Sequence, residues 1–499
     1  MVMFWWWAIP GGAALLGVFV IMLLIVVNYT LLPRKRKSLP RIPKGRFYGS
    51  PFAPKDASDV IIVGAGPAGS TAAFFLKTSN PKLRVTVLEK ETFPRDKICG
   101  EAWCSPALDI LDEMGLLTVL ERERILHDTA TGGFVSPSGD EFIDRSGNRD
   151  STIRKSARTC SIPRIICDMR MIQAAVAQGA KLEESCYVTG ASFDKDEGMW
   201  VVRSSSGAED AEEVFRARML LICDGSNSFL ATKLGLVKTK PTGFCTRQYW
   251  LNGTHKVSAD GILLYPRYFL PGYMALFKHH NGNCYLGSYM LPGGSVTEAD
   301  LIAVHRHAVA HDEIIRRELG PEAVEADPIK VGPIRIRPCR SYAEHLLIVG
   351  DAAGQVDPMT GEGIHTAMIA AKRAASVVCQ MFNAGNFTSA AGEVYHSLWW
   401  DDFGFDSQFS EWGARLIAAY PWLLDAMAAV AQAKGKDFMV DFGEIMTGVK
   451  PKVTFLHPRL AVPLGLAVFK EWFRVVILRR KRDYCSVPYE SKRSRKLKE

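Results

Sequence analysis

Short apolar runs recur along the first three quarters of the chain, separated by stretches with a helical pattern. Residues 60–63 are wholly apolar, a glycine-rich turn follows, and residues 70–76 have the spacing of a helix. Residues 83–88 are again largely apolar, and similar runs occur at 220–223 and 346–349. Strands without polar alternation are typical of parallel sheets that are covered on both faces. The pattern therefore predicts an α/β fold built on a parallel sheet.

The pattern changes after residue 240. Residues 240–340 alternate apolar and polar positions between Pro and Gly breaks, which predicts an inserted antiparallel β-sheet that walls a substrate cavity. The region 386–499 is expected to be helical with a basic tail. Within it, residues 460–478 interleave apolar positions with charged ones and are too charged to span a membrane comfortably. They fit either an amphipathic helix at a membrane interface or a helix packed on the catalytic domain.

The N-terminal segment is uniformly apolar. No charged side chain occurs before Arg34, and residues 8–32 are long enough to cross a hydrocarbon layer of roughly 30 Å. Residues 34–37 are all basic, which by the positive-inside rule leaves the rest of the chain in the cytosol. We expect one transmembrane signal anchor (1–33), with the endoplasmic reticulum as the expected membrane, followed by a basic, Pro-rich linker (34–57).

The distribution of charge and of cysteines bears on whether the protein binds nucleic acid, a membrane or a metal. Residues 34–55 carry eight Lys/Arg and no acid, and residues 479–499 carry nine Lys/Arg against three acids. Because the whole chain has a net charge of +8, residues 56–478 carry −6. Basic flanks on an acidic core favour an anionic membrane surface and argue against nucleic acid. The 11 cysteines contain no CxxC pair, so we predict neither a disulfide scaffold nor a metal site.

A dinucleotide motif lies between the first strand and the first helix. Residues 64–69 read Gly-Ala-Gly-Pro-Ala-Gly, and Glu89 follows the last glycine by 20 residues at the end of the second strand. Gly64 permits the tight turn, Gly66 lets the backbone approach a pyrophosphate, and Gly69 allows close helix packing. The helix N-terminus offers amide donors to phosphates, and Glu89 would accept ribose hydroxyls. This context predicts a Rossmann-like dinucleotide-binding domain.

Two further strands end in an acid beside glycine. Asp224 follows the run at 220–223, and Asp351 follows the run at 346–349. In doubly wound sheets, ligands bind at the carboxyl ends of the strands, where an acid can hold ribityl or ribose hydroxyls. Residues 358–364 then precede a helical run, which positions a second helix N-terminus beside the same edge.

Four segments, in this order, resemble the geranylgeranyl reductase family of FAD-dependent oxidoreductases, which has the p-hydroxybenzoate hydroxylase-like fold. Residues 93–101 resemble its PxxKxCG motif, 271–287 its substrate-domain motif, 358–364 its PxxGEGI loop, and 442–448 its C-terminal segment. The chain departs from the family at Ala275, Lys278 and Glu101, where the family has tryptophan, proline and a second glycine.

The resemblance implies FAD as the cofactor and assigns roles to residues. Cys99 and Tyr273 are the catalytic candidates: Cys99 positions or protonates substrate, and Tyr273 lines the pocket. Packing in the core is the alternative for both. Lys97 and Arg95 contact flavin or phosphate, or are solvated, and Arg164 precedes a helix near the cofactor. The implied cofactor-binding set is Gly64, Gly66, Ala68, Gly69, Glu89, Lys90, Arg95, Lys97, Arg164, Asp224, Asp351, Pro358, Gly361, Gly363 and Ile364.

The expected organisation follows from these motifs. The FAD-binding domain is expected in two parts, 58–239 and 341–385, with the substrate-binding sheet at 240–340 between them. The resemblance implies a membrane-anchored reductase that saturates C=C bonds of a polyprenyl lipid by hydride transfer from reduced flavin. NAD(P)H or a protein electron donor would reduce the flavin. An FAD-dependent monooxygenase or halogenase acting on a hydrophobic substrate, and a flavin-binding scaffold without turnover, are the alternatives.

Overall fold

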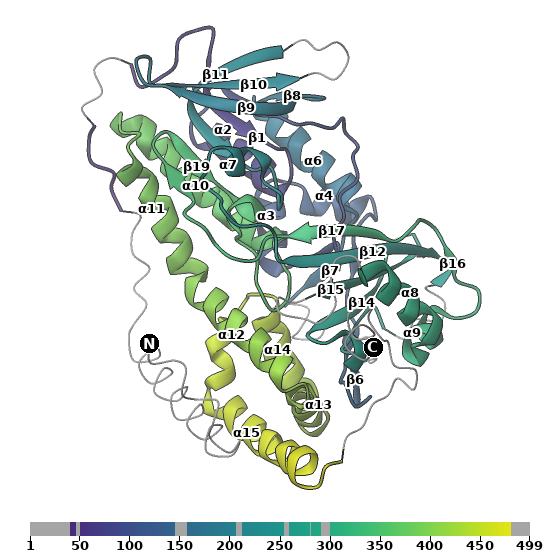
Figure 1. Cartoon of the computed structure of the whole chain (residues 1–499). Coiled ribbons are helices and arrows are strands. Elements are labelled where there is room, and N and C mark those ends of the chain that lie inside the picture. Colours follow the sequence, from purple (N-terminus) through teal and green to yellow (C-terminus); the bar gives the residue numbers. More distant parts are fainter. Residues whose placement is uncertain are drawn as a thin grey trace, which may run out of the picture.

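Two eight-stranded sheets and a group of C-terminal helices make up the fold (Figure 1). The computed structural model of the chain describes residues 40–45, 50–144, 157–205, 212–253, 259–279, 281–290 and 300–480. The signal anchor expected at 1–33 and nearly all of the basic tail lie outside the described residues.

The first sheet is parallel through its centre. Its strand order is β18-β19-β11-β1-β2-β8, and β1 pairs in parallel with both β11 and β2. Strands β10 and β9 extend it antiparallel from β11. The strands are β1 (Ser58–Val63), β2 (Val85–Leu88), β8 (Lys181–Glu183), β9 (Tyr187–Asp194), β10 (Met199–Ser205), β11 (Glu212–Ile222), β18 (Tyr342–Ala343) and β19 (Leu346–Ile348).

Both faces of this sheet are buried, as its uninterrupted apolar strands predict. On one face Val60 and Ile62 belong to a core that includes helix residues, and on the other Ile61 and Val63 pack in a core with Trp200. The helices that follow or flank the sheet are α2 (Pro67–Ser79), α3 (Ser105–Glu113), α4 (Leu117–Arg122), α6 (Arg164–Ala177), α7 (Phe229–Lys233) and α10 (Ile364–Ala384).

The second sheet has the order β16-β12-β15-β14-β13-β5-β6, with β17 paired to β12. It is antiparallel except where β13 and β5 pair in parallel. Helices α8 (Leu301–His311) and α9 (Glu313–Leu319) supply residues to its core. The strands are β5 (Gly132–Val135), β6 (Glu141–Asp144), β12 (Gly243–Leu251), β13 (Gly261–Leu264), β14 (Gly272–Lys278), β15 (Cys284–Met290), β16 (Val324–Glu325) and β17 (Lys330–Ile334).

A three-stranded sheet and the C-terminal helices complete the fold. The small sheet pairs β7 (Thr159–Ser161) with β3 (Ala102–Cys104) and β4 (His127–Asp128). The C-terminal helices are α11 (Ser389–Trp399), α12 (Phe405–Ala419), α13 (Trp422–Lys434), α14 (Lys436–Met446) and α15 (Pro458–Trp472). Among the described residues no single helix is long and apolar enough to cross a membrane; only α11–α12 with α13, bent by 105°, pass such a test together.

The structure differs from the sequence prediction in two places. Part of the predicted linker is packed rather than free, because Ile42 is buried in the main core and Phe52 lies against Phe382. The second sheet is also not drawn from 240–340 alone. Strands β5 and β6 join it from the predicted first FAD segment, because β5 pairs with β13, more than 100 residues away in the chain, and the local sequence does not encode that pairing.

Candidate active site

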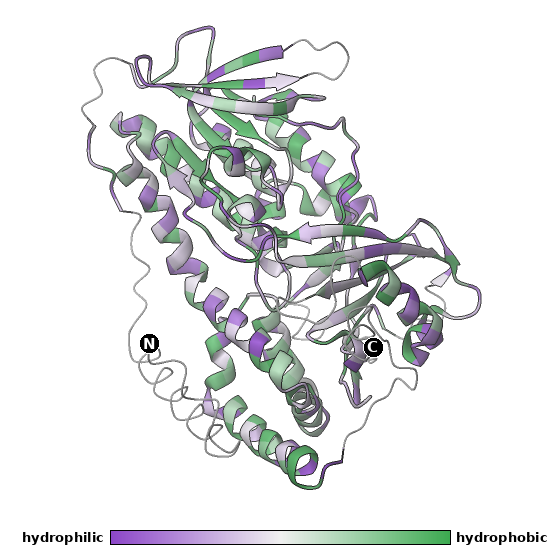
Figure 2. Ribbon diagram, viewed as in Figure 1, coloured by the Kyte–Doolittle hydropathy of each residue, from purple (hydrophilic) through white to green (hydrophobic). Residues whose placement is uncertain are grey.

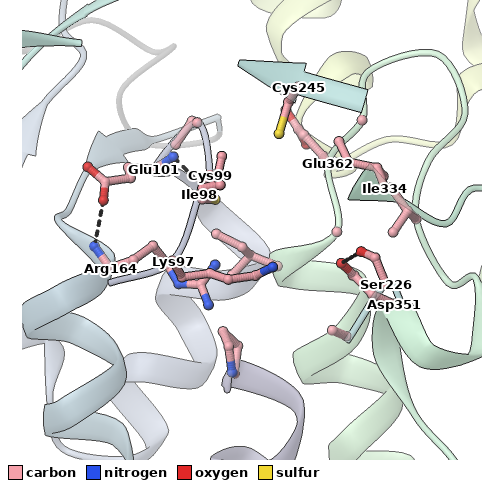
Figure 3. Close-up of a pocket in the computed structure, with 18 of the residues that line it drawn as sticks. Lys97, Ile98, Cys99, Glu101, Arg164, Ser226, Cys245, Ile334, Asp351 and Glu362 are labelled. Atoms are coloured by element: carbon pink, nitrogen blue, oxygen red, sulfur yellow. Dashed lines mark hydrogen bonds between the residues drawn. The ribbon is translucent and has the colours of Figure 1, made fainter. Parts of the chain in front are cut away.

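One cavity of about 870 Å³ joins the carboxyl edge of the first sheet to the second sheet and to α14. Of the 17 residues predicted for the site, 15 line this cavity; Gly69 and Pro358 do not. Figure 3 shows Lys97 and Cys99 on one side of it and Ser226 and Asp351 on the other. Segments far apart in the chain therefore meet in a single space.

The glycine loop has the geometry that its sequence predicts. Gly64 has a φ of +97°, which L side chains rarely adopt. A Cβ at Gly69 would lie 1.9 Å from the Gly64 carbonyl oxygen, so only glycine lets α2 approach the strand. A Cβ at Gly66 would meet nothing nearer than Arg95 Nη2 at 3.7 Å. Gly66 therefore leaves open a cradle at the N-terminus of α2 that a pyrophosphate can fill.

Glu89 and Arg95 frame this cradle. The Glu89 Oε2 atom accepts the Ala65 amide at 2.8 Å and lies 3.6 Å from Arg95 Nε. Arg95 also pairs with Asp168 at 2.9 Å. Its guanidinium is therefore held at the cavity wall by two carboxylates, not solvated. Lys90, by contrast, pairs with Glu91 and is 61% exposed.

The opposite wall carries the two acids at strand ends. The Asp351 Oδ2 atom accepts the Ser226 hydroxyl at 2.8 Å, and a Cβ at Gly363 would lie 2.9 Å from Asp351 Oδ1. Asp224 accepts the Leu230 amide of α7 at 3.0 Å, and burial raises its pKa. Asp351 thus faces the cavity beside the N-terminus of α10, whereas Asp224 also holds α7. These carboxylates, with the cradle at Gly66, fit the hydroxyls and phosphates of FAD.

The loop at 357–363 is clamped from several sides. Asp357 Oδ1 accepts the amides of Met359 and Thr360, and its Oδ2 accepts from Lys452 Nζ at 2.8 Å. The Tyr273 hydroxyl donates to the Thr360 carbonyl, and the Tyr289 hydroxyl donates to the Pro358 carbonyl at 2.9 Å. Gly361, at φ +70°, lies against the Tyr289 ring.

These contacts bear on Tyr273, which was predicted as catalytic. Its phenol is engaged by main chain, and burial raises its pKa well above 10. Tyr273 is therefore suited to position the loop, since its proton is committed to the Thr360 carbonyl.

Cys99 lies in a loop supported by buried charges. It is partly exposed and lines the cavity, and the Glu101 amide donates to its Sγ at 3.4 Å. Arg164, 5% exposed, holds Asp168 through two hydrogen bonds of 2.6 and 2.7 Å. The Arg164 amide donates to Glu101 Oε1 at 2.9 Å, so the predicted residues Cys99 and Arg164 are joined through Glu101 (Figure 3).

Glu101 is a functional-site residue that sequence reasoning registered only as a departure from the family. It is 1% exposed and has a φ of +55°, the left-handed conformation that favours glycine. Burial raises its pKa to about 7, against hydrogen bonds from the Arg164 amide and Tyr249. Its Oε2 atom lies 3.4 Å from His279 Nε2. The replacement of glycine by a carboxylate was the signal that could have identified this buried site.

Glu362 was also missed, although both its neighbours were predicted. It lines the cavity, and burial raises its pKa to about 8, with the charge of Lys452 opposing the shift. The neighbouring His365 has its pKa lowered to about 4 by burial, so it is neutral at pH 7. Cys104, Glu362 and His365 bring ligand atoms within 4.8 Å of one another, but the nearby ammonium of Lys452 disfavours a cation there.

The far end of the cavity is apolar. Strands β13 and β14 contribute one wall and α14 the other. Ala275, where the family has tryptophan, is buried and leaves this end open. The apolar lining residues are Leu263, Ala275, Phe277, Met439, Phe442 and Met446.

Comparison with known proteins agrees with this geometry. Residues 57–385 match the family described as FAD binding domain. The chain is 38% identical over 433 residues to conditioned medium factor receptor 1 of Dictyostelium discoideum, covering 85% of this chain and 83% of that protein. It is 26% identical to digeranylgeranylglycerophospholipid reductase 2 of Methanopyrus kandleri, and the match covers 81% of this chain and 97% of that protein. A geranylgeranyl bacteriochlorophyll reductase-like protein of Thermoplasma acidophilum has the same fold (TM-score 0.64, 16% identity, 83% and 98% covered).

Proposed function

Because the chain belongs to the FAD-binding-domain family, as a geranylgeranyl reductase-like FAD-dependent oxidoreductase, we propose that it saturates C=C bonds of a polyprenyl lipid. The observation that carries this proposal is the single cavity with two chemically different ends. One end offers carboxylates and a glycine cradle, and the other offers mainly apolar and aromatic side chains. Such a space accommodates a dinucleotide and a hydrophobic chain in contact with each other.

The polar end holds the cofactor through groups of this chain. The amides at the start of α2 and the cradle at Gly66 would bind the pyrophosphate, and Glu89 and Asp351 would accept hydrogen bonds from the hydroxyls of the cofactor. Bound FAD, once reduced, supplies a hydride for an alkene carbon. The N-terminus of α10, a helix of 21 residues, faces the same region and stabilises negative charge there.

The second alkene carbon needs a proton, because an isolated C=C bond is a poor hydride acceptor. Glu362 lines the cavity and, with a pKa of about 8, holds a proton at neutral pH. Cys99 lines the same cavity from the opposite loop. We assign proton delivery to Glu362 and substrate positioning to Cys99. The apolar end excludes water, which keeps the proton and the hydride from being lost to solvent.

Cys99→Ala tests this division of roles. We expect the variant to retain FAD and lose most of its turnover through misplaced substrate, by about 10²-fold. Flavin absorbance measures cofactor content, and product formation measures turnover. Loss of FAD from this variant would mean that Cys99 is structural.

Mass spectrometry of prenyl lipids tests the reaction itself. The purified protein is reduced chemically without oxygen, incubated with the lipids, and then assayed again in air. We expect products that gain pairs of hydrogens and no oxygen, and the number of pairs gives the extent of saturation. Oxygen or halogen gain in air alone would instead establish the monooxygenase or halogenase alternative. Anaerobic bleaching of the flavin by NADH or NADPH decides whether a nicotinamide or a protein donor is the reductant.

A flavin-containing binding protein without turnover is the second candidate function. One observation favours it: the relative that is 38% identical over most of both chains is named a receptor. The same assay separates the two, because a yellow and reducible protein that changes no lipid would support this role.

For the cellular setting we propose a single-pass anchor at 1–33 and a catalytic domain that faces the cytosol at the endoplasmic reticulum. The support is the uncharged N-terminal segment and the basic residues that follow it. The sequon at Asn386, in a described segment, then stays unglycosylated. Endoglycosidase-sensitive sugar at Asn386 would overturn this topology.

A further inference from the structure

Helix α15 and its continuation present an apolar face to solvent. The helix runs on into a π-helical turn, η8 (Phe473–Ile477). Leu466 is 69% exposed and Phe469 64% exposed. The exposed large apolar side chains of this segment are Val462, Leu466, Phe469, Phe473, Val476, Ile477 and Leu478. Successive steps of four, three, four and three residues place the first five on one side of the helix. We call these five residues the α15 face.

The opposite side of α15 packs inward. Leu460 is buried, and Leu464 and Ala467 pack against the cluster that contains Phe442 of α14. Figure 1 shows α15 at the lower edge of the molecule, far from the first sheet, and Figure 2 shows hydrophobic residues along this edge. An exposed apolar face of this length at the edge of the molecule indicates a surface that is covered by a membrane or by another protein segment.

Positive charge accompanies the α15 face. Lys470 is exposed. Arg479 and Arg480 directly follow Leu478, the last exposed apolar residue of the segment, and are also exposed. The sequence beyond them, 481–499, adds seven Lys/Arg against three acids. An apolar helix face bordered by basic residues complements an anionic lipid surface, since the headgroups meet the cations and the acyl chains meet the apolar side chains.

We propose that the α15 face lies in the interface of an anionic lipid bilayer and that substrate passes from this bilayer into the nearby apolar end of the cavity. Phe442 both lines the cavity and packs in the cluster that contains Leu460. The cavity is therefore separated from the α15 face by one layer of helices. The contact with lipid stands by itself, whereas access of substrate from the bilayer rests on the proposed function.

A fluorescent label tests the lipid contact without any turnover. Full-length protein carrying Leu466→Cys is labelled with bimane and reconstituted in phosphatidylcholine–phosphatidylserine vesicles with and without brominated acyl chains. We expect brominated lipid to quench this label at least threefold more than a label at Val214→Cys, an equally apolar position that is 55% exposed on β11. Unsubstituted protein treated in parallel corrects for labelling of native cysteines.

Two outcomes overturn the proposal. A label at position 466 that is shielded from water but not quenched by brominated lipid means that protein covers the face, either residues 1–33 of the same chain or a second copy. A label that stays in water and is not quenched means that nothing covers it. Both readings are independent of whether the enzyme reduces prenyl lipids.

Substrate access is tested by Leu466→Asp in the full chain. We expect the KM for a prenyl lipid embedded in vesicles to rise at least fivefold, with unchanged kcat and FAD content. The rate on a short, water-soluble prenyl phosphate should not change, and Val214→Asp should alter neither. Equal loss on both substrates would mean that the substitution damages the fold, and equal retention would mean that substrate does not enter by this face.

Discussion

Two loops that line the cavity are held in place by different kinds of groups. The glycine loop at the cofactor end is shaped by local backbone, since glycines at 64, 66 and 69 and the N-terminus of α2 lie within a few residues of each other. The loop at 357–363, where we expect proton transfer, is held by side chains that meet across the fold. Tyr273 holds Thr360, and Lys452 holds Asp357. A loop shaped by local backbone has almost no room for added atoms. A loop held by distant side chains can instead lose one contact by substitution while the other contacts remain.

Gly69→Ala should break the cofactor end, with the largest expected effect. The new Cβ would lie 1.9 Å from the Gly64 carbonyl oxygen, so α2 must move away from the strand. We expect a loss of about 3 kcal/mol of stability and of bound FAD. Thermal unfolding and flavin absorbance measure the two losses. Gly66→Ala is the matched control: it should fold normally and lose FAD affinity alone. Equal stability of both variants would contradict this account of the loop.

Glu362→Gln should affect chemistry and leave the cofactor end intact. The neutral amide cannot donate the proton, so turnover should fall by about 10²-fold with FAD retained. In the parent protein the active form is protonated, and turnover should fall as the pH rises through about 8. The variant should lose this dependence. Glu91→Gln removes a half-exposed carboxylate of the same cavity and should keep both rate and pH profile. An unchanged pH profile in Glu362→Gln would exclude it as the acid.

Glu101→Gln tests whether the buried carboxylate of Glu101, next to Cys99, lowers the stability of the folded protein. Burial raises the pKa of this carboxyl from 4.5 to about 7. The folded state therefore keeps a proton that the unfolded chain loses, and stability decreases as the pH rises from about 4.5 to about 7. At pH 8 the variant should be more stable than the parent by up to about 3 kcal/mol. Denaturant unfolding at pH 4 and pH 8 measures this gain, which should nearly vanish at pH 4. Destabilisation at both values would mean that the Glu101 charge is fully compensated.

Tyr273→Phe should have the smallest effect. It removes the hydroxyl that donates to the Thr360 carbonyl, at a cost of about 1 kcal/mol. If Tyr273 only positions the loop, substrate KM should rise by a few-fold while kcat and its pH dependence stay the same. Steady-state kinetics separates the two parameters. A large fall in kcat alone would restore the catalytic role predicted from the sequence.

The sequence by itself determined the cofactor end. A buried strand, a glycine turn, a helix and an acid at a set distance are consecutive, and each is dictated by local sterics, as at Gly64 with its φ of +97°. The resemblance of four short segments, each continuous along the chain, also identified the chain as an FAD-dependent oxidoreductase of the geranylgeranyl reductase type, which the comparisons confirm. The membrane anchor at 1–33 stays a prediction, since it lies outside the described residues.

Only the tertiary structure decided how the second sheet and the buried carboxyl groups of the site are assembled. Strands β5 and β6 join the second sheet from far upstream, and Ile42 of the supposed linker is buried, because pairing and packing partners are chosen across the fold. The raised pKa values of Glu101 and Glu362 arise from burial among groups that are distant in the chain. Burial depends on what surrounds a carboxyl in three dimensions, and no pattern of neighbours along the sequence records it.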